Sequence, residues 1–348
     1  MTVVIGSSAS ARHCSSPGIF TISLDFELYW GTRDHRTLAS YGSNILGCQT
    51  AIPAMLELFE EFEIHATWAV VGFVLFADKE DLGSYVPKVV PEYAEARLNP
   101  YPAIDEIGRG DRVREYFFAP ELVARIRATP FQELGTHTFS HYYCLEEGQT
   151  PAAFEADLTA AREATRAKFG SEVQSLVFPR NQFNARYLEL CRRAGIRAYR
   201  GNQRSWVYEP KKGAEETKLR RAIRLVDSYI NLTGHHGHRV SGAPAQPIDV
   251  PASRFLRPWS RSLRLLEPLR LRRIEHDLAH CARHGLLYHL WWHPDNFGAN
   301  TRENVRFLRG ILERFRSLRE EHGMRSLTMG EVAELAPEGE LGVMRESA

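Results

Sequence analysis

The sequence has few cysteines, almost no net charge and no long apolar run, and each absence excludes a class of protein. Five cysteines are scattered over 348 residues without a CxxC pair. A disulfide framework or a cysteine-ligated zinc site is therefore not expected, and a reducing compartment fits best. The 44 basic and 43 acidic residues leave a net charge of +1, which gives no electrostatic case for nucleic acid or an anionic membrane as the main partner.

Membrane and export signals are also missing from the pattern. No stretch approaches the roughly 18 unbroken apolar residues of a membrane helix. The segment Met1–Ser16 lacks a basic region followed by an apolar run, so no signal peptide is expected. With 43% hydrophobic and 25% charged residues, the composition is that of a globular chain with ample material for a core. We expect a cytoplasmic protein with no membrane span.

Short apolar runs alternate with longer amphipathic segments along most of the chain. This alternation predicts an α/β fold with a parallel sheet, closed as a barrel. The predicted strands are Ile19–Leu24, His65–Val71, Glu133–Thr136, Gln174–Phe178, Ile196–Arg200, Leu286–Trp292 and Arg325–Met329. The predicted helices are Thr50–Phe62, Pro120–Ala128, Pro151–Phe169, Ala185–Ala194, Leu269–Arg283 and Arg302–His322.

Two segments interrupt this rhythm, Ala77–Ala119 and Gln203–Pro268. Both are long, polar and weakly periodic, which is typical of lids, subdomains or partner surfaces inserted into a compact domain. No repeat or composition shift marks a domain boundary, so residues 1–348 are expected to form a single catalytic domain with insertions at about 77–119 and 203–268.

Polar residues follow several predicted strands. Asp25 and Glu27 stand at the end of an apolar strand, where the carboxyl ends of parallel strands form active sites in α/β proteins. Taken alone, this pair could equally be a solvated loop. His137 and His141, at i and i+4 after another strand, could present both imidazoles on one face of a helical turn to one metal ion.

Two further strand ends complete the set. The segment Val177–Gln182 presents Arg180, and His293 follows the aromatic run His289–Trp292. Individually these signals are weak. Together, two carboxylates, two histidines, an arginine and a third histidine are the parts of a metal-assisted hydrolase.

The segments SLDFE, HATWAVVG, GTHTFSH, FPRNQF and HLWWHP resemble, in this order, the polysaccharide deacetylase family, also called the NodB-homology or carbohydrate esterase family 4 fold. The resemblance is particularly to the branch encoded with O-antigen and other surface-polysaccharide genes, including those for lipopolysaccharide. It implies a distorted (β/α)7 barrel that hydrolyses N-acyl groups on amino sugars with a divalent metal, for which zinc is expected.

The resemblance also implies roles for individual residues. Asp25 corresponds to the general base, Glu27 to the metal carboxylate, and His293 to the general acid. His137 and His141 correspond to the metal histidines, and Arg180 to the arginine that pairs with the base.

The sequence departs from the family pattern at several positions. Phe26 separates the two acids of the first motif, which usually adjoin, and the second acid is Glu. The third motif reads Pro-Arg-Asn-Gln in place of Arg-x-Pro, so Asn181 is a candidate for substrate binding. Asp227 and Asp295 are the candidates for the aspartate that orients the acid histidine.

Other candidate substrate contacts come from residue type alone. Arg254 and Arg257 could bind the phosphate of a nucleotide- or lipid-linked sugar, since arginine suits phosphate oxygens, although such basic tracts are more often solvated helix faces. Trp292 could stack on a sugar ring, although barrel packing explains it as well. The patch His235–His238 is expected to be a loop.

The expected function is therefore hydrolysis of an N-acetyl or N-formyl group on an amino sugar during surface-polysaccharide synthesis. The substrate could be nucleotide-linked, lipid-linked or a nascent glycan, and the sequence is compatible with a homo-oligomer. Three alternatives remain: an N-deformylase specific for a formylated amino sugar, an inactive carbohydrate-binding member, and a glycoside hydrolase that uses Asp25 and Glu27 as its carboxylate pair.

Overall fold

A computed structural model describes residues 16–205, 207–208, 218–240 and 246–335. The segment Met1–Ser16, in which no signal peptide is expected, lies outside the described residues except for Ser16. Cys14 therefore also lies outside them. The described strands form one sheet in the order β6-β5-β4-β3-β2-β1-β8-β7, with β9 beside β1. Their bounds are β1 Ile19–Phe26, β2 Ala66–Val70, β3 Gln132–Thr136, β4 Ser175–Leu176, β5 Ala198–Tyr199, β6 Ile248–Asp249, β7 Arg254–Phe255, β8 Leu287–Trp292 and β9 Arg325–Ser326.

Every pairing between these strands is parallel. The sheet curls into a partial barrel, with β6 and β7 at the two ends of its hydrogen-bonded path. The predicted α/β architecture of a distorted (β/α)7 barrel is therefore confirmed. All the carboxyl ends of the strands consequently meet at one rim.

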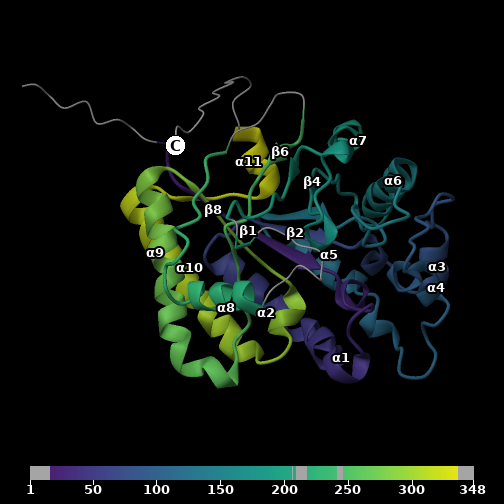
Figure 1. Ribbon diagram of the computed structural model, residues 1–348, viewed down its shortest axis with the longest axis horizontal. Helices are drawn as coiled ribbons and strands as arrows, with labels where there is room; N and C mark the ends of the chain where they lie inside the picture. Colours follow the sequence, from purple (N-terminus) through teal and green to yellow (C-terminus); the bar gives the residue numbers. More distant parts are fainter. Residues whose placement is uncertain (1–15, 206, 209–217, 241–245, 336–348) are drawn as a thin grey trace, which may run out of the picture.

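Helices pack around this sheet. Their bounds are α1 Leu38–Leu46, α2 Cys48–Glu61, α3 Lys79–Gly83, α4 Tyr101–Ile104, α5 Pro120–Ala128, α6 Pro151–Phe169, α7 Leu188–Arg193, α8 Lys218–Asp227, α9 Glu267–His284, α10 Thr301–His322 and α11 Met329–Leu335. Figure 1 shows β1, β2 and β8 in the middle of the molecule, with α9 and α10 on one side and α6 on the other. No described helix is long and apolar enough to span a bilayer.

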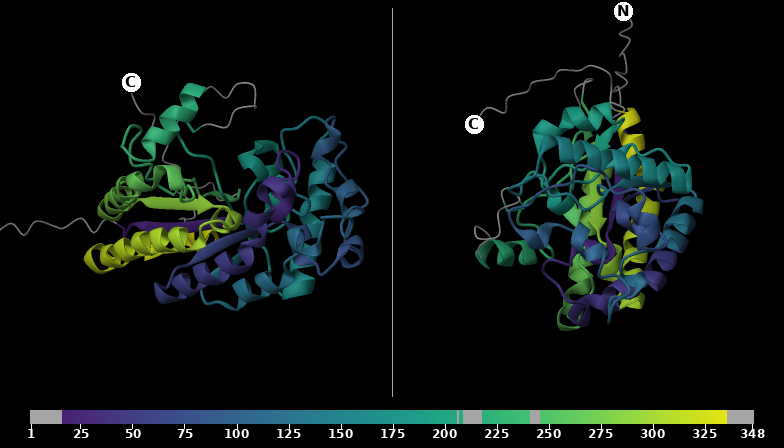
Figure 2. Two further views of the ribbon diagram at one scale, coloured as in Figure 1. Left: turned by 90° about the horizontal axis from the view of Figure 1, so that it is seen from below. Right: turned by 90° about the vertical axis from the view of Figure 1, so that its right-hand side faces the viewer.

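Side chains alternate along the central strand β1, as the pleat of a strand requires. Four large apolar residues are 0–1% exposed and belong to the main core cluster: Phe20, Ile22, Leu24 and Phe26. Phe20, for example, lies 5.3 Å from the ring of Phe315 on α10, the helix that runs beside β1 in the left view of Figure 2. The intervening residues Thr21, Ser23 and Asp25 are equally buried but polar, which leaves them to face the barrel interior.

The amphipathic segments are predicted more accurately than the short strands. Both α5 and α6 have the predicted bounds, Thr150 caps α6 through a bond from the amide of Ala153, and Gly170 and Gly285 end α6 and α9 in the left-handed conformation. In contrast, the segment expected as an insertion at 203–268 contributes β6 and β7 to the sheet. It therefore holds part of the barrel itself, as well as the helix α8.

Candidate active site

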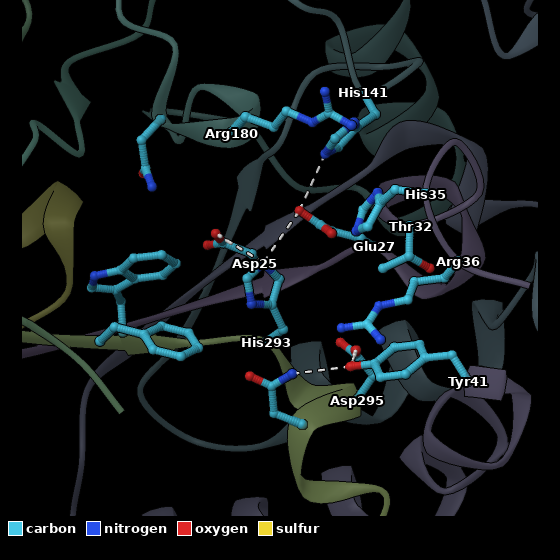
Figure 3. A pocket seen from close by; sticks show the side chains of 15 residues that line it. Asp25, Glu27, Thr32, His35, Arg36, Tyr41, His141, Arg180, His293 and Asp295 are labelled. Carbon is cyan, nitrogen blue, oxygen red and sulfur yellow. Dashed lines mark hydrogen bonds and ion pairs between the residues drawn. The ribbon is translucent and has the colours of Figure 1, made fainter. Parts of the chain in front are cut away.

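The residues that follow the strands converge on one pocket at the carboxyl rim. Asp25 and Glu27 come from the end of β1, His141 from the loop after β3, and His293 from the end of β8 (Figure 3). The cavity has a volume of about 380 Å³, which is within the usual range for small-ligand sites. Its other lining residues are Gly31, Thr32, His35, Arg36, Tyr41, Arg180, Asn181, Phe255, Trp291, Asp295 and Asn296.

Glu27 lies at the centre of the polar cluster on the floor of this pocket. Its Oε1 atom lies 2.8 Å from Nε2 of His137 and 3.2 Å from Nε2 of His141. Glu27, His137 and His141 are all at most 5% exposed. Burial alone would raise the pKa of Glu27, but the neighbouring imidazoles of His293, His141 and His137 together hold it well below its ordinary value. Glu27 is therefore an ionised carboxylate between imidazoles.

The histidines converge through a loop rather than through the predicted helical turn. Thr138 and His141 both have positive φ angles, 62° and 60°, so the backbone from residue 137 to residue 141 is not helical. The two imidazole centroids are nevertheless only 5.1 Å apart. The prediction that both rings reach one point is met, but by a different backbone geometry.

Asp157 on α6 holds this loop in place. Its fully buried carboxylate accepts hydrogen bonds from the backbone amides of Phe139 (2.7 Å) and Ser140 (3.2 Å) and from the Ser140 hydroxyl. Burial raises the pKa of Asp157 to about 6, against the effect of these donors. Sequence reasoning missed this residue, although an acidic side chain on the apolar face of a predicted helix was a signal for it.

The cluster of Glu27, His137 and His141 fits a divalent metal ion. One candidate ligand atom of each residue lies within 4.8 Å of the others, and a carboxylate with two imidazoles is a common donor set for catalytic zinc. Both ring nitrogens of His137 and Nδ1 of His141 are buried without a hydrogen-bond partner in the described residues. Since buried polar atoms are rarely left unpaired, the orphaned nitrogens favour a cation at this place.

Gly31 makes room for the Glu27 carboxylate. A Cβ atom at position 31 would lie 1.6 Å from Oε2 of Glu27. Any side chain at position 31 would consequently displace the carboxylate from the two histidines.

Asp25 has a separate set of partners. Arg200, which directly follows β5, forms a two-pronged ion pair with it, with Nη1–Oδ1 at 2.6 Å and Nη2–Oδ2 at 2.7 Å. Burial alone would raise the pKa of Asp25, but Arg200, helped by His137, lowers it below the ordinary value. Asp25 also belongs to a second group of possible metal ligands, with Glu27 and His293. Because Arg200 engages both of its oxygens, however, Asp25 is held as an ionised group beside the cluster of Glu27, His137 and His141.

The arginine that pairs with Asp25 is thus Arg200, and the role expected of Arg180 is a wrong prediction. Arg180 lies on the pocket wall, pairs with Asp34 and stacks 4.5 Å from the Tyr143 ring. It lies in the short 3-10 helix Pro179–Asn181 and has a positive φ of 55°. The predicted strand Ile196–Arg200 ended at Arg200, so a charged residue closing an apolar strand was the signal that could have identified it.

Arg200 is fixed in turn by the residues around it. Its Nη1 donates to Ser23 Oγ at 3.1 Å and its Nη2 to Asn181 Oδ1 at 3.0 Å. Ser23 also bonds to His289 Nε2 at 2.8 Å. The guanidinium group stacks 4.1 Å from the ring of Trp291. Asn181 lines the pocket and also positions Arg200, and its role as a substrate contact stays a prediction.

His293 lies at the open side of the same cluster, 27% exposed. Its Nε2 is 3.6 Å from Glu27 Oε1 and 3.9 Å from Asp25 Oδ2. Burial opposes protonation, but Glu27 and Asp25 raise the pKa of His293 to about 9. His293 is therefore a proton donor at neutral pH in this environment.

Of the two aspartates considered as partners of His293, only Asp295 is near it. Asp295 lines the pocket, its charge acts on His293, and its Oδ2 accepts a 2.5 Å hydrogen bond from the Tyr41 hydroxyl. Asp227 instead belongs to a buried cluster with Tyr208 and Arg254. Asp227 is thereby excluded as the orienting residue.

Three expected substrate contacts are not at the pocket. Trp292 is fully buried, 5.6 Å from the Phe297 ring on the outer face of β8, whereas its neighbour Trp291 lines the cavity. Arg254 is 4% exposed and paired with Asp227 and Asp277. Arg257 is half-buried and does not line the cavity. The alternation of side chains along β8 determines that Trp291 faces the pocket and Trp292 the core. The position of Arg254 is determined by its ion pairs with carboxylates from distant segments.

Comparisons with known proteins agree with this fold. Residues 41–199, somewhat less than half of the chain, match the family model described as polysaccharide deacetylase; this span includes His137 and His141 but not Asp25, Glu27 or His293. A search of curated proteins found no match.

Several solved structures are similar in fold. A putative polysaccharide deacetylase from Mycobacterium smegmatis is 12% identical with a TM-score of 0.59, covering 99% of this chain and 100% of that one. The α-amylase AmyC from Thermotoga maritima is 11% identical with a TM-score of 0.57, covering 92% and 75%. A GH57-type branching enzyme from Pyrococcus horikoshii is 11% identical with a TM-score of 0.52, covering 94% and 73%. At these identities the likeness establishes the fold alone.

Replacing His137 or His141 with Ala should abolish tight metal binding, because each removes one of three protein ligands from the cluster. Metal analysis after dialysis measures this, with His289→Ala as a matched control, since the His289 ring is equally buried but, among the described residues, bonds to Ser23 and the Val250 carbonyl rather than to Glu27. Full metal occupancy in either ligand variant would refute the ligand assignment.

Asp157→Asn should weaken metal affinity by roughly 10- to 100-fold, the usual cost of losing a residue that orients a ligand. The reason is that the amide side chain cannot accept all the donors of the loop that carries His141. Zinc titration with a competing chelator measures the effect. Unchanged affinity in a folded variant would show that the loop holds its geometry without Asp157.

Trp292→Ala should lower the free energy of unfolding by about 3–5 kcal/mol, the usual cost of emptying a large aromatic site in a core. Trp291→Ala should cost less, since that ring is partly exposed. Denaturant unfolding compares the two. Equal stability losses would contradict the assignment of Trp292 to the core and Trp291 to the pocket.

Proposed function

We propose that this chain is a metal-dependent amidohydrolase of the polysaccharide deacetylase family that removes an acyl group from the nitrogen of an amino sugar. The observation that carries the proposal is the division of labour between two buried carboxylates. Glu27 faces two histidines, whereas Asp25 is clamped by Arg200. A hydrolase that combines a metal with a separate general base requires such a division.

The residues can be assigned to the steps of amide hydrolysis. Glu27, His137 and His141 would hold a divalent cation, for which zinc is expected, and such an ion supplies Lewis-acid polarisation of the acyl oxygen. Asp25 accepts the proton of the attacking water, and Arg200 keeps Asp25 ionised and oriented. The carbonyl carbon then becomes tetrahedral.

Collapse of this adduct needs a proton on the departing nitrogen. His293 carries that proton, because Glu27 and Asp25 favour its charged form, and donates it so that the leaving group departs as a neutral amine. Asp295 adds to the negative field around His293, and Tyr41 fixes Asp295. Trp291 and Phe255, 4.8 Å apart on the pocket wall, offer apolar faces on which a sugar ring can stack.

A glycoside hydrolase is the principal alternative, since enzymes acting on glycosidic bonds share this fold. The site argues against it. Asp25 and Glu27 lie two residues apart at the end of one strand, and each carboxylate already has cationic or imidazole partners. A carboxylate pair that attacks a glycosidic bond must instead flank the sugar, at about 5–10 Å. An inactive carbohydrate-binding protein would not need a general base, a general acid and a set of metal ligands in one pocket.

We further propose a cytoplasmic role in surface-polysaccharide synthesis, such as that of O-antigen, on a nucleotide-linked, lipid-linked or nascent sugar. Four buried cysteines, Cys48, Cys144, Cys191 and Cys281, are free thiols, which supports a reducing compartment. An acetyl or a formyl group fits the proposed chemistry, and a narrow pocket would favour formyl by roughly 1–3 kcal/mol for the missing methyl.

The direct test is release of free amine from N-acetyl and N-formyl forms of one amino sugar, with purified protein loaded with zinc. A clear preference for the formyl form would identify a deformylase, and similar rates would remove the narrow-pocket idea. Absence of amine release from every N-acyl sugar, together with cleavage of a glycosidic bond, would refute the proposal.

Asp25→Asn should lower kcat by roughly 100- to 10,000-fold, the usual worth of a positioned proton transfer, while the protein keeps its metal. Glu27→Gln should instead weaken metal binding. Parallel measurement of kcat and metal content distinguishes base from ligand. An Asp25→Asn protein with normal turnover would overturn the mechanism.

His293→Ala should lower kcat, leave metal content intact and remove the alkaline limb of the pH–rate profile. The sign follows from the role of an acid, because activity is lost as pH rises and the imidazole gives up its proton. Full-range pH profiles of the wild type and the variant test this. An alkaline limb that persists in His293→Ala would assign it to another group.

A further inference from the structure

Arg36 lines the candidate active site, yet no step of the proposed hydrolysis uses it. It lies in the loop between β1 and α1 and is exposed. Among the described residues, no carboxylate lies within ion-pair distance of its guanidinium group. Figure 3 shows the side chain extending toward the part of the pocket where Tyr41 and Asp295 lie.

The backbone of Arg36 is held by two hydrogen bonds, and its guanidinium group lies against an aromatic ring. Its backbone amide donates to the Thr32 carbonyl at 2.8 Å, and its own carbonyl accepts a 3.0 Å bond from the Tyr29 hydroxyl. The guanidinium group lies 5.3 Å from the centroid of the Tyr41 ring, and Tyr41 is itself anchored to Asp295. A cation held in this way loses less conformational entropy on binding than a free surface arginine.

The nearest acidic residue in the sequence does not neutralise Arg36. The carboxylate of Asp34 is fully buried and pairs with His35 and Arg180. Its pKa lies far below the ordinary value, because its hydrogen bond to His35 and the charge of Arg180 outweigh burial. Asp34 thus serves a different arginine, Arg180, which is itself 33% exposed on the pocket wall.

The acids on the pocket floor are also matched. Asp25 is paired with Arg200, and Glu27 faces the cluster proposed to hold a divalent cation. Asp295 accepts a hydrogen bond from Tyr41 and lies in the field of the His293 charge. Once that cation is bound, the charge of Arg36 is in excess over the acids around it. An unpaired, pre-positioned guanidinium group in a sugar-sized pocket is suited to a carboxylate or a phosphate.

We propose that Arg36 binds a negatively charged group, a carboxylate or a phosphate, on the sugar or directly attached to it. The inference rests on the proposed function, because it names the class of amino sugar that the same site accepts. Arg254 and Arg257, which the sequence suggested as anion-binding residues, do not line the pocket. Arg36 does line it and can take that role. The substrate is then an acidic or phosphorylated N-acyl amino sugar rather than a neutral one.

The test compares N-acetylglucosamine, N-acetylglucosaminuronate and N-acetylglucosamine 1-phosphate on the zinc-loaded protein. Binding by calorimetry and amine release are both measured for the wild type, Arg36→Gln, Arg36→Lys and the control Arg302→Gln. Arg302 is an exposed arginine on α10 that does not line the pocket.

We expect at least one charged sugar to bind roughly 10- to 100-fold more tightly than the neutral sugar, the range of a charge-assisted hydrogen bond. Arg36→Gln should abolish this preference, Arg36→Lys should keep part of it, and Arg302→Gln should keep all of it. Preference for the uronate would identify a carboxylate as the ligand, and preference for the 1-phosphate would identify a phosphate.

Equal binding of the three sugars, or a preference that survives Arg36→Gln, would overturn the role of Arg36. This outcome differs from failure of the proposed function. A preference that depends on Arg36 without any amine release would leave the binding role intact and refute hydrolysis of these N-acetyl sugars. Amine release without a preference for the charged sugars would support the hydrolysis and refute the binding role of Arg36.

Discussion

The burial of two carboxylates, two residues apart at the end of β1, is the constraint on which the rest of the site depends. A buried charge is costly unless it is paired and hydrogen-bonded. Asp25 and Glu27 are at most 5% exposed, and both remain ionised. The fold must therefore bring positive or polarisable groups to each of them from distant segments, and the strand order around β1 determines which segments can do so.

Each carboxylate draws its partners from a different part of the barrel. Asp25 points into the interior and pairs with Arg200, which directly follows β5 on the other side of the barrel. Glu27 lies just beyond the strand and is met by the loop after β3, which Asp157 holds from behind. His293 from β8 is close to both. A base, a metal-type cluster and an acid thus arise from a single requirement, the compensation of two buried charges.

Much of this arrangement could be predicted from the sequence, because it follows from local pattern. The periodicity of the strands and helices predicts the barrel, and the position of Asp25, Glu27, His137, His141 and His293 after strands predicts that they meet at one rim. What the pattern does not contain is which of several similar residues turns inward. Trp291 and Trp292 are adjacent on one strand and therefore point to opposite faces of the sheet. A shift of one residue in the strand would exchange the two faces.

The arginines illustrate the same limit. Arg180, Arg200 and Arg254 all lie near strands, but their roles are decided by acids far away in the sequence, namely Asp34, Asp25 and Asp277. The left-handed conformations of Thr138 and His141 likewise cannot be predicted from residue propensities, since tertiary hydrogen bonds to Asp157 impose that loop.

The central claim is that Glu27 holds a metal while Asp25 stays paired with Arg200. A crystal structure of the zinc-loaded protein with anomalous scattering tests this claim most directly. The account predicts one anomalous peak in contact with Glu27, His137 and His141, with the Asp25–Arg200 pair intact. A peak bound to Asp25, or no peak at this cluster in zinc-loaded crystals, would contradict it.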